Sequence, residues 1–356
     1  MTSHRFDDTH ELLAIHHDPA TDLHALIAIH STRLGPAIGG TRLKWYPSLD
    51  AARHDVLRLS EGMTYKTALA GLSLGGGKAV IPYFSEAEGA EWAIPEIRAA
   101  RLIAYAQIVD NLRGRFITAE DANITPGDLA IMKRSTMYVA GLPREEHGSG
   151  DPAPVTARGV VWAMKAITQD AFGSSSLDGL HVAVQGLGNV GMRLVPTLLA
   201  EGASVTAADV RPELAIAANR DFGIATVEPD ALFETHCDVF APCAYGAVLN
   251  STTIPRLRCR AVVGSANNQL DEEAAGELLH ARSILYGVDY VANAGGLINV
   301  AQELAPDGYD EAAALKKTEN IYHTMQRVLT TARDRRISTT MAAQYMAREV
   351  LLAPVA

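Results

Sequence analysis

Along the first 145 residues, apolar residues form either short continuous runs, which predict strands, or repeats every three to four residues, which predict helices. In chain order we expect a strand at 23–30, a glycine-rich loop at 35–40, a helix from 51 to about 66, strands at 79–83 and 116–119, and a helix at 98–112. Ser48 and Asp50 precede the first helix and offer N-caps. This region therefore mixes strands with helices.

A different pattern follows a segment dense in proline, glycine and charge, residues 143–155, which we take as a domain boundary. After a helix at 156–171, the predicted order is a strand at 181–185, a glycine-rich turn at 186–191, a helix at 189–201 and a strand at 204–209. That order is a βαβ unit. Later apolar runs at 237–242, 260–264 and 284–287 would add strands to one parallel sheet. Two helices, one through 321–332 and one after Ser338 or Thr339, close the chain.

The length agrees with two domains, because 356 residues exceed one ordinary core. The expected fold class is α/β, with an N-terminal α/β domain over residues 1–145 and a Rossmann-type domain over residues 150–329, separated by a cleft.

Charge and cysteine content narrow the possible partners. A formal net charge of -10 without a basic block argues against nucleic acid and anionic membrane surfaces. We find neither an apolar stretch long enough to span a bilayer nor a signal-peptide pattern, so we expect a cytoplasmic protein. The three cysteines form no CxxC pair, and His236 beside Cys237 lacks a second ligand pair, so no metal site is expected.

The turn Gly186-Leu-Gly188-Asn-Val-Gly191 lies between a predicted strand and helix, which makes its GxGxxG pattern strong evidence for a dinucleotide site. Gly186 would allow the tight turn, Gly188 the approach of a pyrophosphate, and Gly191 the contact of helix with sheet. Asp209 follows Gly186 by 23 residues, near the spacing at which a carboxylate meets the ribose hydroxyls. NAD is therefore favoured over NADP, although Arg211 could accommodate a 2′-phosphate.

Two lysines, Lys66 and Lys78, flank the triple glycine at residues 75–77, although only seven of the 31 basic residues are lysines. Lysine can lose its proton in a crowded site and arginine cannot, so an amine that titrates is predicted here. We interpret the glycines as a loop that lets another molecule approach the backbone. The segment is not a phosphate-binding P-loop, because Leu72 and Ala79 occupy the positions of its glycine and hydroxyl residue.

Two further polar pairs follow predicted strands. Asp121, after Glu120, could be an acid or base, or the cap of a helix at 127–135, a task that Thr125 or Asp128 could also fill. Asn267 and Asn268 follow the strand that ends near Gly264, where open α/β sheets bind ligands, but they could equally form an ordinary turn.

Taken together, these segments resemble the glutamate, leucine, phenylalanine and valine dehydrogenase superfamily over nearly the whole chain. The matching motifs are GPAIGGTR (35–42), EGMTYK (61–66), LGGGKAVI (74–81), TAEDANIT (118–125), VQGLGNVG (184–191), FAPCAYGAVLN (240–250), GSANNQL (264–270) and NAGGLINV (293–300).

The resemblance implies a role for each matching residue. Lys78 would be the catalytic amine, and Asp121 would handle the protons of the substrate amino group. Lys66, with the backbone of Gly39 and Gly40, would bind the substrate carboxylate. The remaining implied positions are Ala119, Leu297 and Val300 around the substrate side chain, Asn267 at the substrate or nicotinamide, Thr156 at the nicotinamide end, and Asn189 and Val190 within the coenzyme turn.

The resemblance also implies an activity: NAD-dependent, reversible deamination of an L-amino acid to a 2-oxo acid and ammonium. The substrate should be apolar, because no charged residue occurs among the side-chain positions. GMTYK, TAED and GSANNQL are most similar to the leucine enzymes and favour branched aliphatic substrates, whereas Asn123 and Leu297 are closer to the phenylalanine and tryptophan enzymes. A non-catalytic NAD-binding regulator is the alternative of another class. The family further implies a homo-oligomer and a return of residues from about 330 to 356 to the first domain.

Overall fold

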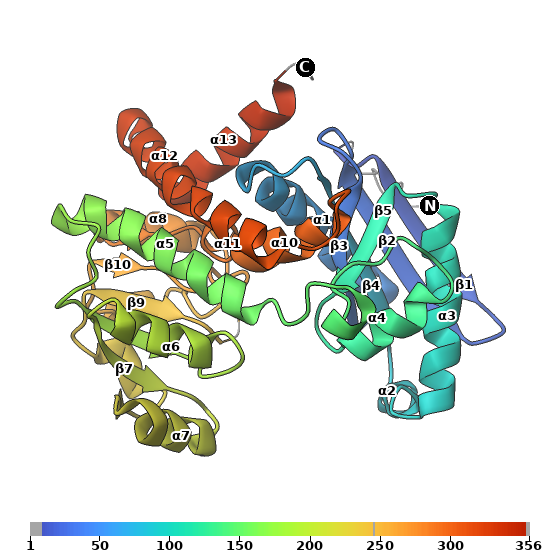
Figure 1. Cartoon of the computed structure of the whole chain (residues 1–356), viewed down its shortest axis with the longest axis horizontal. Helices are drawn as coiled ribbons and strands as arrows, with labels where there is room; N and C mark the ends of the chain where they lie inside the picture. Colours follow the sequence, from blue (N-terminus) through green and yellow to red (C-terminus); the bar gives the residue numbers. More distant parts are fainter. Residues whose placement is uncertain (1–8, 245, 354–356) are drawn as a thin grey trace. The chain divides into compact units, whose positions relative to one another are not determined.

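The computed structural model describes residues 9–244 and 246–353 (Figure 1). The chain forms two compact units. Unit 1 contains the residues up to Asp151, Val300–Tyr309 and the residues from Val350 on, and unit 2 contains Pro152–Asn299 and Asp310–Glu349. The first crossover, after Asp151, falls within the proline- and glycine-rich segment at 143–155.

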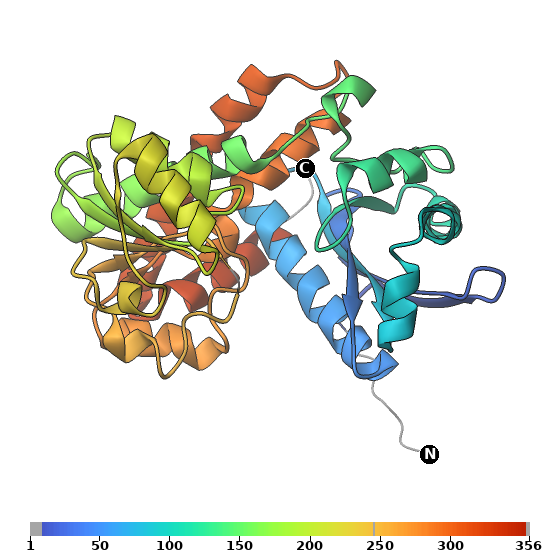
Figure 2. The ribbon, with the colours of Figure 1, turned by 90° about the horizontal axis from the view of Figure 1, so that it is seen from below.

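Unit 1 is built on a five-stranded sheet with the order β1-β2-β4-β3-β5. Its strands are β1 (Leu12–Asp18), β2 (Leu23–Ser31), β3 (Ala37–Trp45), β4 (Gly75–Tyr83) and β5 (Phe116–Glu120). Its helices are α1 (Leu49–Leu69), α2 (Glu86–Glu91), α3 (Pro95–Asn111) and α4 (Pro126–Lys133), with short 3-10 turns at Arg144–Glu146 and Gln302–Leu304. Figures 1 and 2 show α1 on one face of this sheet and α3 with α4 on the other.

Each face of this sheet has its own core, because successive side chains of a strand point to opposite faces. On β2, Leu26 and Ala28 pack towards α1, whereas Ala25 and Ile27 pack towards α3 and α4. A fully buried hydroxyl cluster tightens the second face, where the Thr41 hydroxyl lies 2.6 Å from those of both Tyr105 and Thr118. The sheet is thus a rigid support for residues at its strand ends.

The triple glycine is the start of strand β4, so its interpretation as a ligand-approach loop is wrong. Each glycine accommodates a neighbour within the protein. A Cβ at Gly75 would lie 2.1 Å from the carbonyl oxygen of Ser31, one at Gly76 2.1 Å from the backbone nitrogen of Thr64, and one at Gly77 2.8 Å from the ring of Phe116. The expected loop at 35–40 is also shorter than predicted, because β3 begins at Ala37.

Unit 2 is built on a six-stranded sheet whose paired strands all run parallel, with the order β11-β10-β9-β6-β7-β8. When β6 to β11 are numbered 1 to 6 and the sheet is read from its β8 edge, the order is 3-2-1-4-5-6, the strand order of a Rossmann fold. The strands are β6 (His181–Gln185), β7 (Ser204–Ala208), β8 (Ala225–Thr226), β9 (Val239–Pro242), β10 (Ala261–Val262) and β11 (Leu285–Tyr286). The predicted α/β fold class is therefore confirmed.

Helices cover both faces of this sheet, and Figure 2 shows α6 on one side and α8 on the other. The helices are α5 (Ala153–Phe172), α6 (Gly191–Ala200), α7 (Pro212–Phe222), α8 (Glu273–Ala281), α9 (Asp289–Ala292), α10 (Ala294–Ala301), α11 (Glu311–Thr318), α12 (Asn320–Arg335) and α13 (Thr339–Leu352). Short 3-10 turns lie at Ala231–Glu234 and Ile254–Arg256.

The C-terminal helices differ from the expectation that residues from about 330 to 356 join the first domain. Residues 310–349 belong to unit 2, and only those from Val350 on belong to unit 1. Helix α12 packs on α5, where Arg333 forms an ion pair with Asp170. The hydroxyl of Thr339, at the start of α13, donates to the carbonyl of Tyr286 at 2.7 Å. The apolar face of α12 is therefore buried within unit 2.

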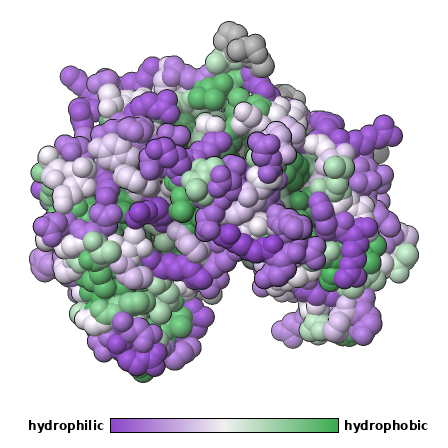
Figure 3. Space-filling model, viewed as in Figure 1, coloured by the Kyte–Doolittle hydropathy of each residue, from purple (hydrophilic) through white to green (hydrophobic). Residues whose placement is uncertain are grey.

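Hydrophilic residues dominate the surface drawn in Figure 3, between smaller hydrophobic patches. Exposed apolar residues include Val210 and Ile216, which are 73% and 66% exposed. In the part of the chain that the structure describes, every helix is too short or too polar to cross a bilayer.

Candidate functional site

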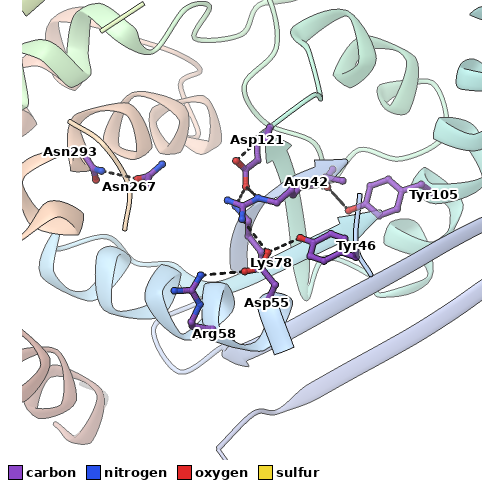
Figure 4. Close-up of polar contacts among 12 residues, drawn as sticks. Arg42, Tyr46, Asp55, Arg58, Lys78, Tyr105, Asp121, Asn267 and Asn293 are labelled. Atoms are coloured by element: carbon purple, nitrogen blue, oxygen red, sulfur yellow. Dashed lines mark hydrogen bonds and ion pairs between the residues drawn. The ribbon is translucent and has the colours of Figure 1, made fainter. Parts of the chain in front are cut away.

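The Lys78 amine and the Asp121 carboxylate meet at the centre of the candidate site in unit 1 (Figure 4). Lys78 lies on β4, on the face that packs against α1, and Asp121 directly follows β5. Nζ of Lys78 forms an ion pair with Oδ2 of Asp121, and both side chains are largely buried, at 9% and 17% exposure. The sequence predicted both residues, and the fold brings them into contact from strands separated by β3.

Arg42 is a third member of this cluster that the sequence analysis missed. Its Nε lies 3.3 Å from Oδ2 of Asp121, and its Nη1 lies 3.1 Å from Oδ2 of Asp55. The Tyr46 hydroxyl donates to the same Asp55 oxygen at 2.6 Å, as Figure 4 shows. The buried charges therefore form a chain from Lys78 through Asp121 and Arg42 to Asp55. The signal was the last residue of GPAIGGTR, where an arginine falls inside a buried strand.

The pKa values of the neighbouring carboxyl groups of Asp121 and Glu120 shift in opposite directions. Burial disfavours the Asp121 carboxylate, but the positive charges of Lys78 and Arg42 outweigh burial and hold the pKa of Asp121 well below its usual range. The pKa of Glu120 is raised by burial, and by the negative charges of Asp151, Asp121 and Glu303. Asp121 is thus a negatively charged partner for the lysine at neutral pH.

Asp121 does not cap helix α4, which answers the alternative left by the sequence. The Thr125 hydroxyl accepts the backbone N–H of Asp128 at 3.2 Å, and the Asp128 side chain accepts the backbone N–H of Thr125 at 2.7 Å. These two bonds form a capping box. Asn123, in a left-handed conformation, donates its side-chain amide to the Leu43 carbonyl at 2.9 Å, so that amide fixes the turn after β5.

Other predicted substrate residues of unit 1 lie on neighbouring elements. Gly40 pairs in register with Ala119, and a Cβ on Gly40 would lie 2.8 Å from that of Asp121. A Cβ on Gly39 would lie 1.8 Å from the carbonyl oxygen of Gly77 on β4. Lys66 lies in the last turn of α1, two residues after Thr64, which contacts Gly76.

The predicted side-chain positions lie on β5 and α10. Ala119 and Val300 are buried, and Val300 is near Gly141. Leu297 and Val300 are three residues apart on α10, so they share one side of that helix.

In the glycine turn of unit 2, each of the three motif glycines is needed for a different structural reason. Gly186 adopts a φ of +97°, which side chains rarely tolerate, and a Cβ on Gly191 would lie 2.0 Å from the Gly186 carbonyl oxygen. A Cβ on Gly188 would meet only Nη2 of Arg211, at 3.9 Å, so space remains above its backbone. Asn189 and Val190 complete the turn before α6. This combination of a tight turn, close helix packing and one open glycine fits a bound pyrophosphate.

Asp209 lies at the end of β7, next to the glycine turn. Its carboxylate accepts the backbone N–H of Leu187 at 2.7 Å and that of Arg211 at 2.9 Å. The Arg211 guanidinium is 57% exposed and lies 3.4 Å from the same carboxylate. The carboxyl end of β7 therefore carries a fixed carboxylate, that of Asp209, with the exposed guanidinium of Arg211 beside it.

Asn267 is oriented by Asn293, another residue that the sequence analysis did not single out. The Asn293 amide donates to Oδ1 of Asn267 at 2.7 Å and to the Ser265 carbonyl at 3.1 Å (Figure 4). The NH2 group of Asn267 is therefore directed away from Asn293. Asn268 has a left-handed φ of +50°, so this segment is also a turn.

Thr156 lies near the start of α5, where α10 packs closely. Its hydroxyl donates to the Pro152 carbonyl at 2.9 Å. A Cβ on Gly295 would lie 2.3 Å from the Val155 carbonyl oxygen, and one on Gly296 2.7 Å from the Thr156 hydroxyl. These two glycines let α10 reach α5.

Comparisons with known proteins agree with this geometry. The dimerisation domain of Glu/Leu/Phe/Val dehydrogenase matches residues 13–138, and the Glutamate/Leucine/Phenylalanine/Valine dehydrogenase domain matches residues 148–211 and 208–353. The leucine dehydrogenase of Geobacillus stearothermophilus is 45% identical over 93% of this chain and 88% of its own length. The L-tryptophan dehydrogenase of Nostoc punctiforme is 44% identical over 96% of this chain and 93% of its own.

The crystal structure of L-tryptophan dehydrogenase from Nostoc punctiforme superposes with a TM-score of 0.82, at 41% identity, over 96% of both chains. The resemblance stated from the motifs is thereby confirmed. The chain belongs to the Glu/Leu/Phe/Val dehydrogenase family and is an amino-acid dehydrogenase, an oxidoreductase of the NAD(P)-dependent class.

Proposed function

We propose that this enzyme catalyses the reversible, NAD-dependent deamination of a branched aliphatic L-amino acid to its 2-oxo acid and ammonium. The observation that supports this most is the buried contact between Lys78 and Asp121. A lysine held against a carboxylate inside the protein is a costly arrangement for stability alone. Lys78 and Asp121 both lie in motifs shared with the dehydrogenase family, and a buried pair of this kind is expected of an enzyme that transfers protons between these side chains and its substrate.

Lys78 acts as the proton acceptor and donor in this proposal, and Asp121 exchanges protons with the substrate amino group. Lys66, with the Gly39 and Gly40 backbone, binds the substrate carboxylate. Bound NAD would supply the acceptor for the hydride that leaves the α-carbon. Lys78 then takes a proton from the water that adds to the cationic imine of the substrate, and the C–N bond breaks as ammonium leaves. This task suits a side chain that can accept and release a proton.

The substrate side chain is proposed to face Ala119, Leu297 and Val300. These residues are apolar, and Ala119 and Val300 are buried, so a charged substrate such as glutamate would lose its hydration without gaining a partner. The identity to leucine dehydrogenases supports a branched aliphatic substrate. An aromatic substrate is the second candidate, favoured by the 44% identity and structural likeness to the tryptophan enzyme.

The coenzyme is proposed to bind along Gly186, Gly188, Asn189, Val190 and Gly191, with Asp209 at the adenosine ribose. The Asp209 carboxylate would repel a 2′-phosphate, which favours NAD over NADP. Thr156 and Asn267 are assigned to the nicotinamide end.

A substrate panel tests the proposed reaction. Formation of NADH or NADPH is measured at alkaline pH with leucine, valine, phenylalanine, tryptophan and glutamate, each with NAD and with NADP. We expect the highest kcat/KM with leucine or valine and NAD. Higher values with the aromatic amino acids would favour the second candidate. Absence of turnover with every pair, despite measurable NAD binding, would support a non-catalytic regulator.

Gly188→Ala tests the coenzyme site separately from the fold. Because a methyl group here meets open space, the free energy of unfolding should stay within about 1 kcal/mol of the wild type, while the Kd for NAD rises at least about tenfold. Fluorescence titration with NADH and urea unfolding measure the two quantities. Gly62→Ala, whose new methyl group would meet no atom within 4 Å, is the matched control. Unaltered NADH affinity in Gly188→Ala would contradict the assignment.

Two further properties belong to the same proposal. We infer a homo-oligomer, supported by the match of residues 13–138 to a dimerisation domain, and β1 is an edge strand of that region. We also infer a cytoplasmic location, supported by the three cysteines, all of which are free thiols.

A further inference from the structure

A cluster of two histidines and one aspartate lies at the turn of the β1–β2 hairpin, on residues that the proposed reaction does not use. His17 and His24 are directly opposite each other in the antiparallel pairing, and Asp22 lies just before β2. One ligand atom from each residue lies within 4.8 Å of the others. No short motif marks the cluster, because a spacing of seven residues brings these side chains together only through the hairpin.

The positions of these atoms are close to those of a metal site. Zinc binds histidine nitrogen and carboxylate oxygen at about 2.0 to 2.2 Å, which places ligand atoms of a tetrahedral site about 3.3 Å apart. Nε2 of His17 is already 3.1 Å from Oδ1 of Asp22. The two imidazole rings are stacked with centroids 4.3 Å apart and therefore lie in nearly parallel planes, so one ring must tilt before both can bind the same ion.

The hairpin also orients the cluster. The His24 ring packs edge-on against Phe84, with centroids 5.6 Å apart, which limits its rotation. On the other strand, His17 is exposed and has room to rotate towards an ion. The ordinary alternative is a surface hydrogen bond between His17 and Asp22, but such a bond needs no second imidazole opposite.

We propose that His17, Asp22 and His24 bind a divalent transition-metal ion of the Zn²⁺ class, with the fourth position open to water. Imidazole with carboxylate suits Zn²⁺, Cu²⁺ or Ni²⁺ better than Mg²⁺ or Ca²⁺, which prefer oxygen ligands alone. The ion would join β1, an edge strand, to β2 beside the turn.

Zinc titration of the intact, chelator-treated protein tests this site. Isothermal titration calorimetry at neutral pH should show one Zn²⁺ per chain in the wild type. His17→Gln and His24→Gln should each weaken that site at least about tenfold, since a ligand is lost. His16→Gln is the matched control, because its side chain points to the opposite face of the same strand and should leave the affinity unchanged.

Two further measurements distinguish this site from zinc binding elsewhere on the chain. Zn²⁺ should raise the Tm of the wild type and of His16→Gln, but not that of His24→Gln, whose fold is verified by circular dichroism. Cys259→Ser tests the other cluster of soft ligands, because the thiols of Cys237 and Cys259 contact each other. Zinc binding lost in Cys259→Ser, or unchanged in both hairpin variants, would overturn the proposal.

Discussion

Replacing Lys78 by alanine is expected to lower kcat by about 10²- to 10⁴-fold, the usual contribution of a positioned acid or base. The fold should survive, because Asp121 keeps Arg42 and the backbone N–H of Ala122 as partners. Steady-state NADH formation with the best amino acid of the panel measures the loss. Circular dichroism and urea unfolding verify that the variant is folded.

Lys78→Arg separates proton transfer from charge. Arginine restores a positive partner for Asp121 but cannot release a proton, so kcat should remain nearly as low as in the alanine variant. Lys44→Ala, an exposed lysine of β3 in the same sheet, is the control and should leave kcat within about twofold of the wild type. Recovery of activity in Lys78→Arg would mean that the charge, and not a transferable proton, is what the reaction needs.

The elements that the sequence predicted well have a strong local signal. The strand at 181–185 agrees with β6 to the residue, because an apolar run ends at a glycine turn whose spacing fixes the register. The missed strands lack such a signal. Strand β1 lies at the sheet edge with mixed exposure, so its sequence LLAIHHD shows no alternation. Strand β8 has only two residues.

The candidate site shows the same division between local and long-range information. Lys78 and Asp121 could be predicted because each lies in a short motif. Arg42 also ends a short motif, but its pairing with Asp121 and Asp55, like that of Tyr46 with Asp55, could not be predicted, because it depends on how the strands and α1 pack around one another. Likewise, the triple glycine was misread because only the fold reveals that Thr64 and Phe116 occupy the space of the missing side chains.

Asp121→Asn is expected to lower both stability and activity, since it leaves Lys78 and Arg42 as neighbouring buried cations with a neutral amide between them. Removing one partner of a buried ion pair typically costs about 3 to 5 kcal/mol, and kcat should fall at least about 10²-fold. Urea unfolding and steady-state kinetics measure the two effects. Asp50→Asn, which removes a carboxylate from an exposed pair with Arg53, should cost less than about 1 kcal/mol.

The pH dependence of the unfolding free energy tests whether loss of the Asp121 charge causes the lower stability of Asp121→Asn. Because Lys78 and Arg42 hold the pKa of Asp121 below that of an unfolded aspartate, the carboxylate stabilises the fold fully above the unfolded pKa of about 3.9. This stabilisation is lost as the pH falls through the folded pKa. The difference in unfolding free energy between wild type and Asp121→Asn should therefore be constant from neutral pH to about pH 5 and shrink below about pH 4. A difference that instead shrinks as the pH rises from about 5 to about 8 would assign the lost stability to another group.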